Sequence, residues 1–172
     1  MPSSRILIAS NTLTGTAASV TFSSIPATYD DLVLSMSARS STTPAQATIN
    51  IIFNNNTSSL YSLTMIRGNG ATADSQNSSG ATEISFATSI PGAGATSNTF
   101  GNLELYIPSY RVSQNKPLSS FAAQETNATT AYIRADAALF RSTTAISEIK
   151  IDANTFNFVS GSSFWLYGIK NS

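Results

Sequence analysis

Short runs in which apolar and polar residues alternate recur from one end of the 172-residue chain to the other. In one of them, Leu32, Leu34 and Met36 share a face while Val33, Ser35 and Ser37 point the other way, which is the period of a β-strand. Clusters of Gly, Pro, Asn and Ser/Thr bound the runs, and helical spacing is nowhere sustained over three turns. The pattern therefore predicts an all-β protein.

The alternating runs also give the expected strand positions. Strands are expected at Arg5–Ala9, Ala18–Phe22, Leu32–Ala38, Thr48–Phe53, Leu63–Arg67, Glu83–Thr88, Phe100–Ile107, Leu118–Glu125, Tyr132–Phe140, Ile146–Ile151 and Phe164–Ile169. The polar segment Gly68–Gly80 is expected to be a surface loop, and Ser58–Leu63 leaves room for one helical turn. Many strands without crossover helices predict a single antiparallel β-sandwich domain over residues 1–172, of the jelly-roll type.

Charge is scarce in this chain. Only 10% of its residues are charged, against about 25% in an average soluble protein. Ser and Thr take their place and make up about three residues in ten, well above their usual share. Hydroxyls cost less to desolvate than charges, so such a surface is suited to burial in interfaces. Net charge is zero and the nine basic residues are scattered, which predicts binding to neither nucleic acid nor an anionic membrane.

Cysteine and histidine are both absent. Their absence removes disulfides, thiolate chemistry, the usual general base and the usual metal ligand, so we expect neither a metal nor another cofactor. The apolar run Ile6–Ala9 near the N-terminus is too short for the core of a signal peptide. No stretch approaches the length of a transmembrane helix.

The motifs that suggest chemistry all have simpler interpretations. Adjacent Asp30 and Asp31 are interpreted as turn formers after Pro26 rather than as an acid pair. A glycosidase would need two facing carboxylates, and the candidates have no recognisable setting. These candidates are Glu83, Glu104, Glu125, Asp136 and Glu148. The stretch Pro91–Thr96 lacks the Gly-Lys-Ser/Thr ending of a phosphate loop and is expected to be a hairpin or a flexible loop. The sequence therefore predicts no enzyme.

Aromatic residues are the strongest candidates for binding. Tyr61, Tyr106, Tyr110, Tyr132 and Trp165 can stack either on a sugar or on a neighbouring subunit, although core packing is the more frequent role of any single aromatic. The C-terminal run Phe164–Ile169 is apolar on both faces, which predicts a strand that is central or buried between subunits.

Several segments together resemble small structural proteins of tailed-bacteriophage virions. The similarity begins with Val20–Pro26, Tyr29–Leu34 and Ser37–Arg39. It continues through Ile51–Asn54, Tyr61, Gly68–Gly70, Ile90–Ala93, Thr96, Asn98, Phe100–Gly101 and Phe164–Ile169. The resemblance spans nearly the whole chain, but its motifs are structural and bring no catalytic residues. It implies a jelly-roll-like module on the virion, assembled in the cytoplasm of the host bacterium.

From this resemblance we expect a head decoration, or cement, protein. Such a protein bridges neighbouring copies of the major capsid protein, and jelly-roll modules of phage particles suggest a homotrimer. The absence of a fibrous stalk favours the head over the tail. Arg5 and the N-terminal strand are the expected contacts with the capsid lattice.

Two other functions remain open at this point. A tail or fibre-tip protein would bind host surface glycans through Tyr61, Tyr110 and the Asn-rich turn Asn54–Asn56. Trp165 is a further candidate for contact with a sugar or a neighbouring subunit. A small polysaccharide-degrading enzyme would need a pair of carboxylates across a groove.

Overall fold

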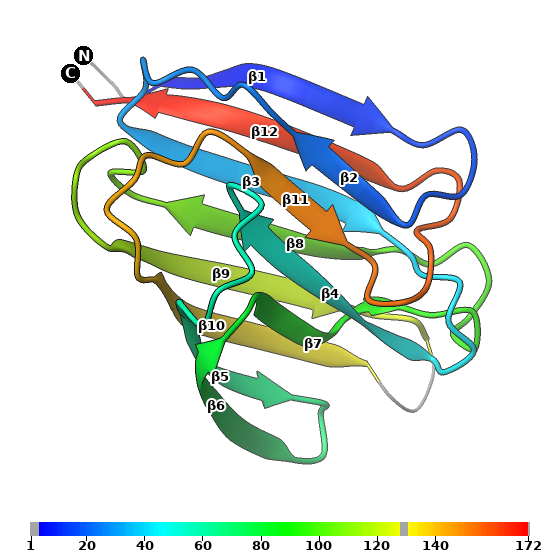
Figure 1. The fold of residues 1–172 in the computed structure, drawn as a ribbon. Coiled ribbons are helices and arrows are strands. Elements are labelled where there is room, and N and C mark those ends of the chain that lie inside the picture. The colour runs from blue at the N-terminus through cyan, green and yellow to red at the C-terminus, as the bar shows by residue number, and fades with distance from the viewer. Residues whose placement is uncertain (1–3, 128–130, 172) are drawn as a thin grey trace.

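The computed structural model describes residues 4–127 and 131–171, and its ribbon is built from strands joined by loops (Figure 1). In chain order the strands are β1 (Ser4–Thr12), β2 (Ser19–Phe22), β3 (Asp31–Ala38), β4 (Gln46–Phe53), β5 (Tyr61–Gly68), β6 (Ala73–Ala81), β7 (Ile84–Pro91), β8 (Gly101–Ile107), β9 (Lys116–Gln124), β10 (Tyr132–Phe140), β11 (Ile149–Asp152) and β12 (Ser163–Lys170).

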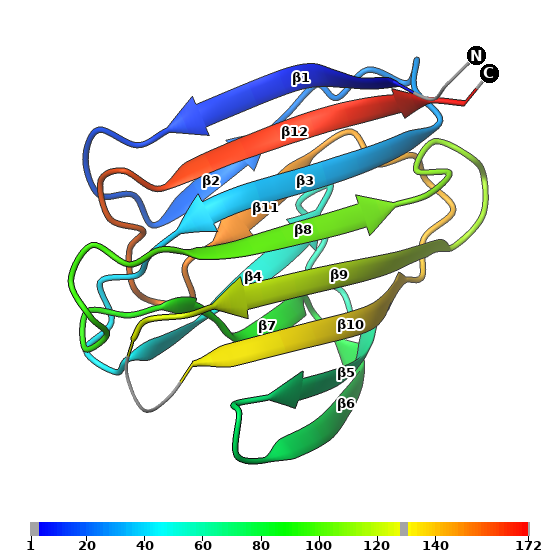
Figure 2. The same ribbon diagram turned by 180° about the vertical axis from the view of Figure 1, so that it is seen from behind.

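Two antiparallel sheets face each other as a sandwich. The large sheet has eight strands in the order β1-β12-β3-β8-β9-β10-β5-β6, and the small sheet has four in the order β2-β11-β4-β7. Figure 2 shows the large sheet in front, with the small sheet behind its upper and central strands and the β5–β6 hairpin at its lower end. The chain changes sheet repeatedly, at β1–β2, β2–β3, β3–β4, β4–β5, β6–β7, β7–β8, β10–β11 and β11–β12, a connectivity compatible with a jelly roll. The predicted all-β sandwich is confirmed.

Each expected strand overlaps a strand of the structure, but two local expectations are wrong. The segment Gly68–Gly80, expected as a loop, contains all of β6 except Ala81, and Ser58–Leu63 forms no helical turn because β5 begins at Tyr61. Strand β6 lacks apolar alternation because Ala73–Gly80 is exposed on both faces and contributes nothing to the core. Its partner β5 alternates clearly, with Leu63 and Met65 buried and Thr64 and Ile66 exposed.

One hydrophobic core fills the space between the sheets. Its members alternate along the strands, as in Leu32, Leu34 and Met36 of β3. An aromatic cluster lies at the β5 end, where the ring centroid of Phe140 is 4.8 Å from that of Tyr61 and 5.4 Å from that of Phe53. The C-terminal strand β12 is an interior strand between β1 and β3, as its two apolar faces predicted.

The Gly-containing segment after β7 is tightly packed. A Cβ atom on Gly92 would lie 2.0 Å from the backbone oxygen of Pro44, and one on Gly94 would lie 2.4 Å from that of Thr43. The buried guanidinium of Arg39 donates hydrogen bonds to the carbonyl oxygens of Ala93, Ala95, Thr96 and Thr99. The segment is therefore a closely packed turn between the sheets, whose carbonyl oxygens are directed at the Arg39 guanidinium.

Candidate functional site

An irregularity in β7 organises the polar part of the interior. The register between β4 and β7 advances two residues along β4, from Ala47 to Ile49, but four along β7, from Ile90 to Phe86. Thr88 in this bulge has a φ of 57°, in the left-handed region that β-branched residues rarely adopt. Because a bulge leaves backbone groups without ladder partners, β7 needs hydrogen-bond donors from elsewhere.

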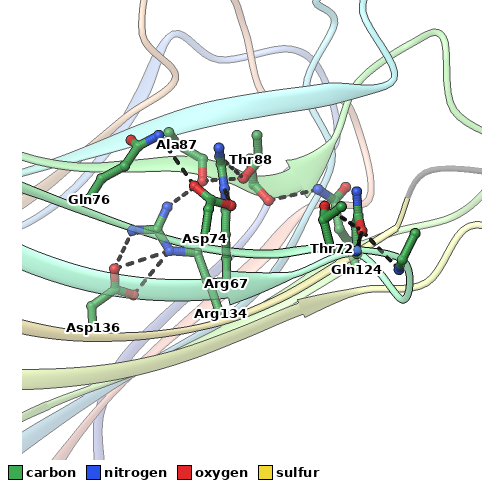
Figure 3. Close-up of polar contacts among 11 residues, drawn as sticks. Arg67, Thr72, Asp74, Gln76, Ala87, Thr88, Gln124, Arg134 and Asp136 are labelled. Atoms are coloured by element: carbon green, nitrogen blue, oxygen red, sulfur yellow. Dashed lines mark hydrogen bonds and ion pairs between the residues drawn. The ribbon is translucent and has the colours of Figure 1, made fainter.

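Two side chains of the large sheet supply such donors to the backbone, and a third binds the side chain of Thr88 (Figure 3). Arg134 donates to the carbonyl oxygen of Ala87, and Gln124 donates to that of Thr88 at 2.7 Å. Arg67 donates to the hydroxyl oxygen of Thr88 at 3.1 Å. We call this set the bulge network, and it ties β5, β9 and β10 of the large sheet to β7 of the small sheet.

Two carboxylates balance the arginines of the bulge network. Asp136 accepts hydrogen bonds from Arg134 and, at 2.6 Å, from Ser120. The side chains of Arg134 and Asp136 are each only 1% exposed. Asp74 of β6 accepts from Arg67 at 2.8 Å and is partly exposed. Asp136, one of the carboxylates considered for a glycosidase, is thus part of a buried ion pair and does not face an open groove.

The adjacent acids Asp30 and Asp31 serve distant segments rather than a local turn. Asp31 is buried at the start of β3 and accepts from Tyr106, Ser109 and Asn171, at 2.8, 2.8 and 3.0 Å. Asp30 accepts from Arg111 and from the backbone of Asn171, and these hydrogen bonds lower the pKa of its carboxyl group. The pair thus fastens the C-terminal end of the chain to β3. Among residues 4–127 and 131–171, no group of three His, Cys, Asp or Glu side chains is placed to hold a metal ion.

Two of the aromatic candidates lie in the core. Tyr61 and Tyr110 are fully buried, and their hydroxyl groups donate to the carbonyl oxygens of Asn56 and Pro26. Their rings cannot stack on a sugar, so the core interpretation is correct for both. Asn54 is also engaged, since its amide oxygen accepts from the backbone of Ser147 and of Glu148.

Two further binding candidates, Trp165 and Arg5, lie on the outer face of the large sheet. Trp165 is half-buried on β12, and the register places it opposite Ser35 of β3. Arg5 on β1 reaches across β12 and β3 to Glu104 on β8, with two hydrogen bonds of 2.9 and 3.0 Å. This ion pair lowers the pKa of Glu104, and both side chains stay about half exposed. Arg5 and Trp165 are therefore accessible, while Tyr61 and Tyr110 are not.

An exposed apolar surface that was not predicted from the sequence lies on the same outer face. Ile66 of β5, Phe121 of β9 and Ile133 of β10 are 63%, 51% and 52% exposed, and we call these three residues the outer patch. The register aligns Phe121, Ala135 and Ile66 in one row across the three strands. Together with Ala73 and Ser75 of β6 they line a groove of about 580 Å³. Alternation would have placed each residue on the outer face, but only the strand order brings them together.

The outer patch is bordered by small side chains. Ala123, Ala135 and Ala137 alternate with buried residues on β9 and β10, so these small side chains point outward beside the patch. Small outward-facing side chains let another protein approach the sheet closely, and exposed aromatic and aliphatic side chains are typical of interface centres.

Comparisons with known proteins identify no family. No family model matches the chain, and no curated protein matches it. One solved structure, described as the structure of infectious bursal disease virus Gx strain, aligns with 98% of this chain and 39% of its own at 12% identity and a TM-score of 0.13. An alignment of that quality supports no statement about fold or function. In the described part of the chain, no helix is long and apolar enough to cross a membrane.

Proposed function

We propose that the protein is a non-enzymatic structural protein of a tailed-bacteriophage virion, and that it decorates the head and stabilises it by bridging capsid subunits. The resemblance of the sequence to virion structural proteins supports the setting. The outer patch is the single structural observation that carries the proposal, because it offers a partner protein an uncovered apolar surface on a broad sheet.

A passive mechanism follows from this surface. A protein that binds only the assembled lattice stabilises it by mass action, because every bound copy favours the closed arrangement of subunits over the loosened one. Ile66, Phe121 and Ile133 would supply apolar area at the centre of the contact. The low charge of the chain means that such binding depends weakly on salt.

The second candidate function, glycan binding at the tail, keeps one supporting observation. Trp165 and Tyr167 are neighbours on the outer face of β12, and both are half-buried with part of each side chain accessible. Two aromatic side chains on a flat sheet can stack on sugar rings. Binding of the purified protein to host cells or to a glycan array would favour this function, and a pure cement protein should ignore both.

The decoration role predicts heat-sensitive particles when the protein is missing. Phage particles made without it should still assemble and adsorb to the host. On heating, however, they should release their genome at a lower temperature than complete particles. Adding purified protein back should restore the original release temperature, because the binding surface is on the outside of a finished lattice. Genome release can be followed by the fluorescence of a DNA-binding dye during a temperature ramp.

A triple variant of the outer patch is the matched control for this experiment. Ile66→Ser, Phe121→Ser and Ile133→Ser change exposed side chains, so the variant should fold but fail to restore the release temperature. An equal release temperature with and without the protein would contradict the proposal. Loss of adsorption without any change in heat stability would move the assignment to the tail.

A further inference from the structure

Strand β6 is an open edge of the large sheet. It lies at one end of the strand order and pairs only with β5, while Ala73–Gly80 is exposed along its whole length (Figure 1). One side of its backbone therefore presents N–H and C=O groups to solvent. Such an edge is a template on which another strand can pair.

The other edge strands of the two sheets carry features that discourage pairing. Strand β2 has only four residues, and β7 contains the bulge at Thr88 and ends at Pro91. Strand β1 is interrupted by a register shift between Leu7 and Ala9. Short edges, bulges and prolines are the devices by which β proteins avoid edge-to-edge association.

Strand β6 has none of these devices over most of its length. It contains neither proline nor lysine, and its register shift falls at Gly80, near its C-terminal end. The run Ala73–Ser79 is regular, and its one charged residue, Asp74, is paired with Arg67 of the same chain. Within the described sheets, β6 is thus the edge best suited to accept a strand.

The sequence of this run fits a second copy of itself. An antiparallel pairing about a two-fold axis at Gln76, the midpoint of the regular run, places Ser75 opposite Asn77 of the other copy. It also places Asp74 opposite Ser78 of the other copy, so no like charges meet. All opposed side chains are small or polar, and the chain has no net charge to oppose self-association.

We propose that β6 is a self-association edge, through which two copies of the chain join their large sheets by antiparallel β6–β6 pairing. The partner is a second copy rather than an unrelated strand, because the run opposes only small or polar side chains to itself and brings no like charges together. This two-fold contact takes the place of the three-fold association expected by analogy with jelly-roll modules. This dimerisation is a property of the free protein, so its test does not depend on whether the protein has a role in the virion.

A pair of charge variants at Ser75 and Asn77 tests both the edge and its register. Ser75→Lys with Asn77→Lys sets lysine against lysine twice across the two-fold axis and should weaken dimerisation about tenfold or more. Ser75→Lys with Asn77→Glu changes the same exposed positions but sets lysine against glutamate twice, so dimerisation should be at least as strong as in the unmodified protein. Sedimentation velocity over a range of protein concentrations measures both.

Hydrogen exchange provides a second readout on the unmodified protein. Amides of β6 should become more protected as concentration rises, while those of the edge strand β1 should not. A monomer at all concentrations, a trimer, or equal weakening by both double variants would overturn the proposal.

Discussion

Replacing Arg134 with methionine is expected to lower the free energy of unfolding by about 3–5 kcal/mol. The substitution leaves the carboxylate of Asp136 buried without its ion pair, and removes one of the two donors to the carbonyl oxygen of Ala87 in the bulge. A buried charge without its ion-pair partner carries a large desolvation penalty, and the carbonyl oxygen of Ala87 keeps only the hydrogen bond from the hydroxyl group of Thr88. The loss should therefore exceed that of an ordinary surface substitution several-fold.

Urea unfolding followed by tryptophan fluorescence measures this loss, since Trp165 is the single tryptophan. Arg5→Met is the matched control, because it removes an exposed ion pair with Glu104 and should cost no more than about 1 kcal/mol. The double variant Arg134→Met/Asp136→Leu should be more stable than Arg134→Met alone, since no unpaired charge remains. A loss below about 1 kcal/mol in Arg134→Met would show that the bulge network does not hold the sheets together.

Phe140→Ala is expected to have a similar effect for an apolar reason. Phe140 is fully buried and packs against Tyr61 and Phe53. Removing its ring loses the transfer free energy of the side chain and leaves a cavity between rings that cannot fully close, which together cost about 3–5 kcal/mol. Thermal or urea unfolding of the purified variant measures the change.

Phe121→Ala is the control for the aromatic core. Phe121 is 51% exposed in the outer patch, so its truncation should change the stability of the free protein by only about 0.5 kcal/mol. A loss for Phe121→Ala as large as that for Phe140→Ala would contradict the placement of these two rings. Comparison of the two variants thus distinguishes a residue that stabilises the core from an exposed residue that is available for binding.

Alternation was a reliable guide to strands where one face is buried. The pattern of Leu32, Leu34 and Met36 is set by the core itself, so local sequence carries the information. Strand β6 escaped prediction because both of its faces are exposed, and its extended conformation is imposed by pairing with β5. The two apolar faces of β12 correctly indicated an interior strand.

Long-range polar contacts could not be read from the sequence. Arg134, Gln124 and Arg67 lie on three strands, and only the strand order brings them to the bulge at Thr88. Lys116 is likewise buried, and its ammonium group donates to the backbone carbonyl oxygens of Val112, Gln114 and Ser142. Burial lowers the pKa of this group, an effect that no local pattern indicates.

Binding residues were harder to predict than core residues for the same reason. Tyr61 follows an Asn-rich segment and Tyr110 follows Pro108, which suggested loops, but both side chains turn inward and their hydroxyl groups donate to backbone oxygens. The outer patch combines one residue from each of three strands and leaves no contiguous motif.

The number of copies of this protein per virion tests the central claim most directly. Quantitative mass spectrometry of purified particles, with the major capsid protein as internal reference, gives this number. The decoration role predicts a copy number that approaches one per capsid subunit or follows the local symmetry axes of the lattice. A few to a few tens of copies would contradict head decoration and point to the tail, and absence from the particle would contradict a virion role altogether.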